Sequence, residues 1–250
     1  MMVQQKFFLA VAACMAMLLG SVTSANGATL AHHYDFTSGV VDLVGSENGT
    51  LFGDANVSSG RLNLDGNGDY VQFATSIIPT SGSYSVALFG QRDVNQAAFT
   101  EIISQGQSGG PGFYIGTNPA GNIRVGDLWT ATGVPFGPVG SLTSYAVVVD
   151  AGAGTSKLYV NGAVVGTLAT AITIGATGTA TRLGRQFTSI NEYFNGSLDD
   201  VRIYTGALTS QEVALIATPV PEPGTFALMA VGFLTVSALV HRRKPQAFCA

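Results

Sequence analysis

The sequence predicts an all-β protein, a two-sheet antiparallel sandwich, placed between an N-terminal signal peptide and a short C-terminal transmembrane helix. Glycine makes up 32 of the 250 residues, and stretches with a helical period are scarce. Short β-branched or aromatic runs recur between turns instead, which is typical of strands. About a dozen such runs imply two packed sheets.

Residues 1–28 are typical of a secretory signal peptide. Lys6 supplies the positive charge, Phe7–Gly20 is apolar, and Ser21–Ala31 is small and polar. A lipoprotein signal ending at Cys14 is the alternative. Apolar residues continue past Cys14, however, so we favour its loss with the leader. The segment predicts export and cleavage by signal peptidase.

Residues 29–218 have the size of one domain with a real core. Cysteine is absent from this range, since Cys14 lies in the leader and Cys249 in the tail 245–250. No disulfide is therefore expected in the mature protein. Seven Arg and Lys stand against fourteen Asp and Glu, a net charge near −7. Nucleic acid is not an expected partner, because its binding needs a basic stripe.

Within this domain, the strands are expected at the β-branched and aromatic runs between turns. These are His32–Phe36, Arg61–Leu64, Tyr70–Phe73, Tyr84–Gln91, Phe99–Ser104, Phe113–Ile115, Asn122–Leu128, Tyr145–Asp150, Lys157–Val160, Ala163–Leu168, Thr181–Leu183 and Phe194–Tyr204. Asn161-Gly162 predicts a two-residue type I′ turn between two of them. A single short helix is predicted after a capping box, with Thr209 at the N-cap and Glu212 returning to it.

Residues 219–244 combine three ordered elements. The first is an extended, exposed segment that a protease can grip, because proline fixes φ and restricts the residue before it. It consists of Val220, Pro221, Glu222 and Pro223. The second is the apolar run Phe226–Val240, about 22 Å as a helix against a hydrocarbon core of about 30 Å. The third is the basic cluster Arg242, Arg243 and Lys244, which should stay cytoplasmic.

This order resembles the PEP-CTERM sorting signal of Gram-negative bacteria that make exopolysaccharide. The resemblance implies recognition and removal of the tail by an exosortase, after a transient stay in the inner membrane. The six residues Pro245–Ala250 depart from the pattern, since such tails usually stop soon after the basic cluster. An ordinary single-span anchor is the alternative.

The domain itself is similar to laminin-G-like, concanavalin A-like jelly-roll domains. Phe194–Tyr204 followed by Gly206–Ile216 resembles their closing motif, and Leu64–Val71, Tyr84–Phe89 and Leu158–Gly162 match in the right order. The resemblance implies two antiparallel sheets with the first and last strands paired. Two positions depart from it. A tryptophan is common where Phe89 stands, and a Trp-x-His pattern is common near Ser144–Ala146.

Catalysis is not expected. Laminarinase-type relatives supply two carboxylates from a Glu-x-Asp-x-x-Glu strand, and that spacing does not occur in this sequence. The glutamates Glu47, Glu101, Glu192 and Glu212 are remote from one another in sequence. The domain's two histidines, His32 and His33, are adjacent, which suits neither a Ser-His-Asp triad nor a three-ligand zinc site.

Calcium is the ion that the resemblance allows, since relatives often hold a structural ion between the first and last strands. Asp199 is then the first candidate ligand, with Asp35 or nearby carbonyls across the gap. The alternative is that Asp199 and Asp200 bind turn amides and pair with Arg202 or Arg185. No cofactor is required for the expected function.

Glycan contact is the functional hypothesis. The sequence has one tryptophan, and sugars stack on aromatic rings while polar groups fix their hydroxyls. Trp129 with Asp127 and Arg124 is the candidate contact set, and a core tryptophan is the alternative. We expect a secreted or surface-displayed, non-catalytic module that contacts extracellular polysaccharide or matrix. A purely structural envelope protein and a glycan-active enzyme remain the competing hypotheses.

Overall fold

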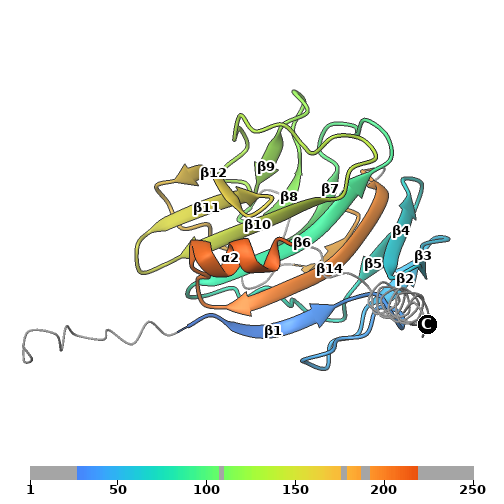
Figure 1. The fold of residues 1–250 in the computed structure, drawn as a ribbon, viewed down its shortest axis with the longest axis horizontal. Coiled ribbons are helices and arrows are strands. Elements are labelled where there is room, and N and C mark those ends of the chain that lie inside the picture. Colours follow the sequence, from blue (N-terminus) through green and yellow to red (C-terminus); the bar gives the residue numbers. More distant parts are fainter. Residues whose placement is uncertain (1–26, 107–109, 176–178, 187–191, 219–250) are drawn as a thin grey trace, which may run out of the picture.

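The structure is a computed structural model that describes residues 27–106, 110–175, 179–186 and 192–218. Its strands form two antiparallel sheets (Figure 1), and one hydrophobic core draws residues from both. This confirms the predicted all-β jelly-roll sandwich. The predicted signal peptide and the run Phe226–Val240 lie outside the described residues. Among those residues, no helix is long and apolar enough to span a membrane.

The larger sheet has eight strands. In spatial order they are β12 (Ala163–Leu168), β11 (Thr155–Val160), β10 (Thr143–Asp150), β6 (Tyr84–Arg92), β14 (Asn195–Thr205), β4 (Arg61–Asp65) and β3 (Asn56–Ser58), with β1 (Thr29–Tyr34) also paired to β14. The long β14 pairs with β4 through its first half and with β1 through its second half. First and last strands are therefore neighbours, as the family resemblance implied.

The smaller sheet has six strands. Their order is β2 (Thr50–Phe52), β5 (Tyr70–Gln72), β13 (Thr179–Leu183), β7 (Glu101–Gly106), β8 (Phe113–Thr117) and β9 (Ile123–Val125). The predicted strand Asn122–Leu128 is shorter in the structure. Gly126 takes a φ of 59°, and the chain turns there so that Val125 bridges to Trp129.

Alternation along the strands places the core between the sheets. On β10, Tyr145, Val147 and Val149 point into the main core, whereas Ala146 and Val148 join a second apolar cluster on the outer face. The helix α2 (Ser210–Ile216) covers that outer face through Val213, which is 1% exposed. Strand β10 is thus buried on both faces, which explains its nearly continuous apolar run.

Two local predictions are confirmed in detail. Asn161 and Gly162 have φ angles of 50° and 78° between the paired strands β11 and β12, as a type I′ turn requires. The capping box also forms. The Glu212 amide donates to Thr209 Oγ1 over 3.2 Å, and the Thr209 amide donates to Glu212 Oε2 over 2.7 Å.

Candidate functional site

The outer face of the six-stranded sheet is polar and aromatic. Its inward row consists of fully buried apolar residues that pair in register across five strands, namely Val71, Leu183, Ile103, Ile115 and Val125. Because side chains alternate between faces, their neighbours point away from the core. These neighbours are Gln72, Arg182, Ser104, Tyr114 and Arg124.

One end of this face holds a cluster of rings and guanidinium groups, here called the Tyr70 cluster and made of Phe52, Tyr70, Tyr193, Arg182 and Arg185. Phe52 stacks on Tyr70 with ring centroids 4.6 Å apart and planes 5° from parallel. The Tyr193 ring lies 6.3 Å from that of Tyr70. Phe52 is 38% exposed, so part of this apolar surface faces solvent. Flat rings of this kind can stack on the faces of sugars.

The two arginines of the Tyr70 cluster lie against its tyrosine rings. The guanidinium carbon of Arg185 is 4.9 Å from the Tyr70 ring centroid and 5.2 Å from that of Tyr193. That of Arg182 is 5.7 Å from the Tyr70 centroid. Burial, and then the charge of Arg185, lower the pKa of Arg182. Both cations are therefore held close to each other at the sheet surface.

Hydrogen bonds extend the Tyr70 cluster across the sheet. Arg182 donates from Nε to Gln72 Oε1 over 3.0 Å and from a terminal nitrogen to the Gln186 carbonyl over 3.3 Å. The Gln186 side chain in turn donates to Glu101 Oε1 over 3.4 Å. These donors and acceptors suit recognition of hydroxyl groups beside the rings.

At the other end of the face, Arg124 is buried between two rings. Its guanidinium carbon is 4.2 Å from the Tyr114 centroid and 4.7 Å from the Phe99 centroid. It pairs with Glu101, which is fully buried. Burial lowers the pKa of Arg124, and the charges of Glu192 and Asp127 oppose that shift. Two glutamates that are remote in sequence, Glu101 and Glu192, thus both act on this cation.

Of the three predicted contact residues, Arg124 and Asp127 lie together on the outer face, whereas Trp129 lies in the core. Arg124 and Asp127 both contact Tyr114, because Asp127 accepts from the Tyr114 hydroxyl over 3.1 Å. Trp129 is 9% exposed and belongs to the main core. Trp129 is therefore a core residue, as the alternative hypothesis held, and its ring has almost no free face for stacking. Sequence reasoning missed the Tyr70 cluster, since its members come from four separate segments.

The candidate calcium residues lie where β14 bulges between β4 and β1. Asp200, next to Asp199, has a φ of 50° at the register shift. Burial, then the charges of Asp200 and Asp35, raise the pKa of Asp199 to about 6, while Arg61 opposes them. Among the described residues, however, Asp199 and Asp35 do not belong to a group of three carboxylate, histidine or cysteine ligands within 4.8 Å of one another. Calcium binding stays a prediction.

Other groups near the bulge are already partnered. Asp200 pairs with His33 Nε2 at 2.6 Å and with Arg202 at 2.7 Å, and Asp35 accepts from the Thr37 amide over 3.0 Å. The other histidine, His32, pairs with Asp42 at 2.6 Å. Burial acts to raise the pKa of Asp42. The hydrogen bond with His32 and those from three backbone amides outweigh it and lower this pKa to about 2. These histidines tie strand β1 to its neighbours.

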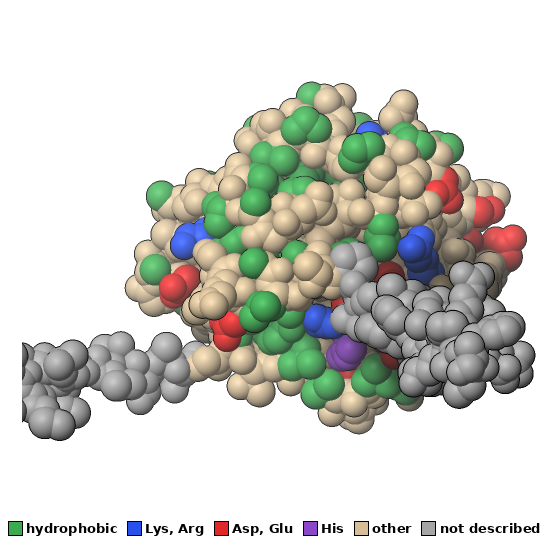
Figure 2. All heavy atoms as spheres, viewed as in Figure 1, with side chains coloured by type: hydrophobic (Ala, Val, Ile, Leu, Met, Phe, Trp, Pro, Cys, Tyr) green, Lys and Arg blue, Asp and Glu red, His purple; other side chains and the backbone are tan. Residues whose placement is uncertain are grey.

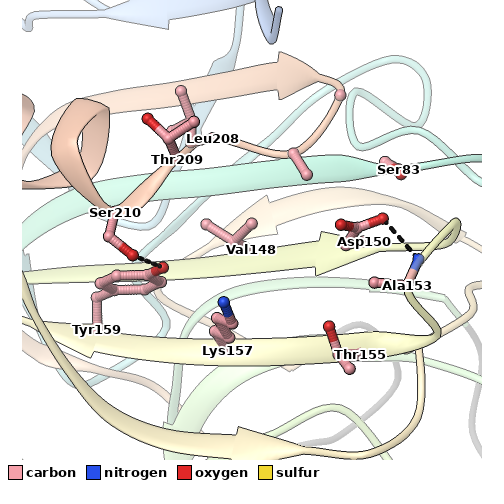
Figure 3. Close-up of a pocket in the computed structure, with 12 residues that line it drawn as sticks. Ser83, Val148, Asp150, Ala153, Thr155, Lys157, Tyr159, Leu208, Thr209 and Ser210 are labelled. Carbon is pink, nitrogen blue, oxygen red and sulfur yellow. Dashed lines mark hydrogen bonds between the residues drawn. The ribbon is translucent and has the colours of Figure 1, made fainter. Parts of the chain in front are cut away.

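Two further surface features were not predicted. A groove of about 640 Å³ lies between the start of α2 and the β10–β11 hairpin (Figure 3), where Tyr159 contacts Ser210 at 3.0 Å. Among the described residues, three carboxylates come within 4.8 Å of one another, those of Asp54, Asp65 and Asp69. In Figure 2, several acidic side chains gather at the right-hand edge of the view, and the other charges on the face that carries α2 are few and scattered.

Two family models match the chain. The one described as the concanavalin A-like lectin/glucanases superfamily covers residues 65–214, and the PEP-CTERM protein-sorting motif covers residues 219–244. The second match includes all the residues proposed for the sorting signal, which lie outside the described part of the structure. A search of curated proteins finds no match.

Solved structures share the fold at low identity. Domain 4 of the extracellular arabinanase AbnA from Geobacillus stearothermophilus, in complex with arabinotriose, is 24% identical with a TM-score of 0.57, covering 77% of this chain and all of that one. A Trypanosoma rangeli sialidase is 13% identical with a TM-score of 0.58, covering 75% and 32%. The botulinum neurotoxin serotype D binding domain is 14% identical with a TM-score of 0.56, covering 76% and 51%. This chain thus spans about a third of the sialidase and half of the toxin domain.

Proposed function

Because the chain belongs to the concanavalin A-like lectin/glucanases superfamily, we propose that it is an exported, non-catalytic module that contacts extracellular polysaccharide. The contact surface is the outer face of the six-stranded sheet. The Tyr70 cluster carries this proposal, since it combines partly exposed rings with amide and guanidinium donors. The arabinotriose complex of the arabinanase domain supports it as a likeness of fold.

Glu101, on the same face, is not placed for hydrolysis. Glu101 is fully buried and held by Arg124 and Gln186, so it has no free path to a glycosidic oxygen. A retaining or inverting glycosidase needs two carboxyl groups that flank the scissile bond and can exchange protons with substrate. We therefore infer binding without cleavage.

The sorting motif implies export and a place at the cell surface or outside the cell, and the sandwich followed by this motif fits an exosortase substrate. We further infer a Gram-negative host, signal peptidase cleavage near residue 28, and an inner-membrane intermediate before exosortase processing. Display in many copies would let weak single contacts add up through effective concentration.

Retention on the host's own polysaccharide tests the proposed function. We expect the purified mature protein to be retarded by that polysaccharide in affinity electrophoresis. Tyr70→Ala should weaken retention about tenfold, as truncation of an aromatic anchor typically does. Tyr70→Phe is the matched control, because it keeps the ring and should keep the binding.

Three outcomes would overturn the proposal. Unchanged retention of Tyr70→Ala would place the contact elsewhere. Absence of retention for the wild type would favour a purely structural envelope protein. Release of reducing ends from the polysaccharide by the pure protein would show that it is an enzyme.

A further inference from the structure

The edges of the two sheets carry backbone groups that a further strand could pair with. Each edge strand has N–H and C=O groups on its outer side, and a strand from another chain can add to them. The edges of the eight-stranded sheet are β12, β3 and the free side of β1, and those of the six-stranded sheet are β2 and β9.

All of these edges except β12 are short or covered by the chain. Strands β2, β3 and β9 have three residues each, and so short an edge gives an added strand little to pair with. A loop also covers β9, because the Ile123 amide donates to the Val134 carbonyl over 2.7 Å. The outer side of β1 is covered in the same way, since the Leu43 amide donates to the His33 carbonyl over 2.9 Å.

Strand β12 is longer and open. It has six residues, lies at the edge of the larger sheet (Figure 1) and pairs with β11 on one side, while no described strand pairs with it on the other. Val164 and Val165 are 46% and 39% exposed. A bulge places Val165 out of register, and Gly166–Leu168 continue the pairing beyond it.

The sequence of this edge also lacks the usual protection. Natural edge strands often carry lysine or proline, which discourage the addition of another strand. Residues 158–181 contain no charged residue and no proline. The domain as a whole has seven Arg and Lys against fourteen Asp and Glu, so two copies repel each other over much of their surface. At β12 they can meet without placing like charges opposite each other.

The position of the C-terminal end indicates which partner fits. Helix α2 packs on the outer face of the eight-stranded sheet, and the described domain ends at Thr218, directly after it. Two identical strands that pair antiparallel are related by a twofold axis perpendicular to the sheet. Both copies of α2 then lie on the same side of the joined sheet. Copies held on one surface through the sorting motif at 219–244 can therefore pair without turning over.

We propose that β12 joins two copies of this chain as antiparallel neighbours in one continuous sheet. The β-branched side chains of Val164 and Thr167, which neighbour β11 on its outer face, pack across the twofold axis. The six-stranded sheets of both copies lie together on the opposite side of the joined sheet. If their outer faces bind glycan as proposed above, the dimer presents two contact faces in one direction, and weak single contacts add up.

Sedimentation of the purified mature protein over a range of concentrations tests the pairing. We expect a reversible equilibrium between monomer and dimer. Val164→Lys and Thr167→Lys should each weaken dimerisation at least about tenfold, since like charges placed across a strand pair oppose it. Val94→Lys is the matched control, because Val94 is 47% exposed and lies beyond the end of β6, three strands away from β12. It should leave the equilibrium unchanged.

A mixture of oppositely charged variants gives a gain of pairing as the second readout. Val164→Lys and Val164→Glu should each be monomeric at concentrations where the wild type is a dimer. Their equimolar mixture should form a heterodimer, because opposite charges then meet across the paired strands. Melting temperatures show whether each variant is folded.

The outcomes separate this inference from the proposed function. A wild type that stays monomeric at every concentration would overturn the inference. A dimer that Val164→Lys and Thr167→Lys leave intact would overturn it as well, because the contact would lie elsewhere. An equal loss in Val94→Lys would show that net charge, rather than the β12 edge, controls association. Retention of a monomeric protein on polysaccharide would leave glycan contact standing without the dimer.

Discussion

At the scale of single residues, the environment of a side chain decides its role, and sequence shows that environment only in part. Trp129 is an example. Its ring lies over Gly166 of β12, where an added Cβ would come within 2.8 Å of Trp129 Cζ2. The tryptophan and the glycine thus pack as a pair across a long sequence separation. Since nothing local marks that contact, a stacking role and a core role looked alike in the sequence.

Asp199 provides a residue-scale prediction with a defined sign. Its pKa is raised from 3.8 to about 6 in the folded protein. Folding therefore favours the protonated form, and this contribution to stability is present below the unfolded pKa and lost as the pH rises through about 6. Asp199→Asn, which stays neutral, should melt higher than the wild type at pH 7 and nearly the same at pH 4. Thermal unfolding with chelator at both pH values measures this.

Calcium binding would change the expected difference in thermal stability between the wild type and Asp199→Asn. If the ion binds as predicted, calcium at pH 7 should stabilise the wild type, by about 2.7 kcal/mol at a hundredfold excess over Kd, and should leave Asp199→Asn unaffected. A wild-type melting curve that responds to neither calcium nor chelator contradicts the site.

At the scale of elements, the strands with a strong pattern of their own were predictable and the weakly patterned ones were not. Strand β10 carries a continuous apolar run and occurs as expected. Strands β2 and β3 have three residues each and are mostly exposed. Their pairing with β5 and β4 places them in the sheets, so their existence depends on neighbours rather than on their own sequence. The Tyr70 cluster includes Phe52 of β2, so it too depends on the pairing of β2 with β5.

The capping box of α2 is a local device, and its contribution should be measurable alone. Thr209→Ala removes the side-chain acceptor for the Glu212 amide and should cost about 1 kcal/mol of unfolding free energy. Thr80→Ala, an exposed threonine away from the helix, is the control and should cost much less. Denaturant unfolding of the purified protein compares them. Equal losses would mean that the cap contributes nothing specific.

At the scale of the whole molecule, both ends of the described domain lie on one sheet. Thr29 pairs with Thr205 in the eight-stranded sheet, and α2 packs on the outer face of that sheet. The Tyr70 cluster lies on the outer face of the other sheet. A chain tethered through its C-terminal end would therefore carry its contact face on the side away from the tethered sheet.

Removal of the C-terminal segment is the prediction that concerns the whole molecule. Because the sequence predicts that Pro221-Glu222-Pro223 is extended and precedes a marginal apolar run, the mature protein should lack Phe226–Lys244. Intact-mass measurement of envelope material, with exosortase-deficient cells for comparison, measures the processing. A dominant species that keeps the apolar tail in exosortase-positive cells would leave only the ordinary anchor.

Hydrogen exchange of the purified mature protein, with and without the host's polysaccharide, tests most directly whether glycan binds the outer face of the six-stranded sheet. Amides that bound ligand shields exchange more slowly. We predict slowed exchange in β2, β5 and β13 and around Arg185 and Tyr193, with β10, β11 and α2 unchanged. Slowing confined to the eight-stranded sheet, or none at a saturating polysaccharide concentration, would contradict the account.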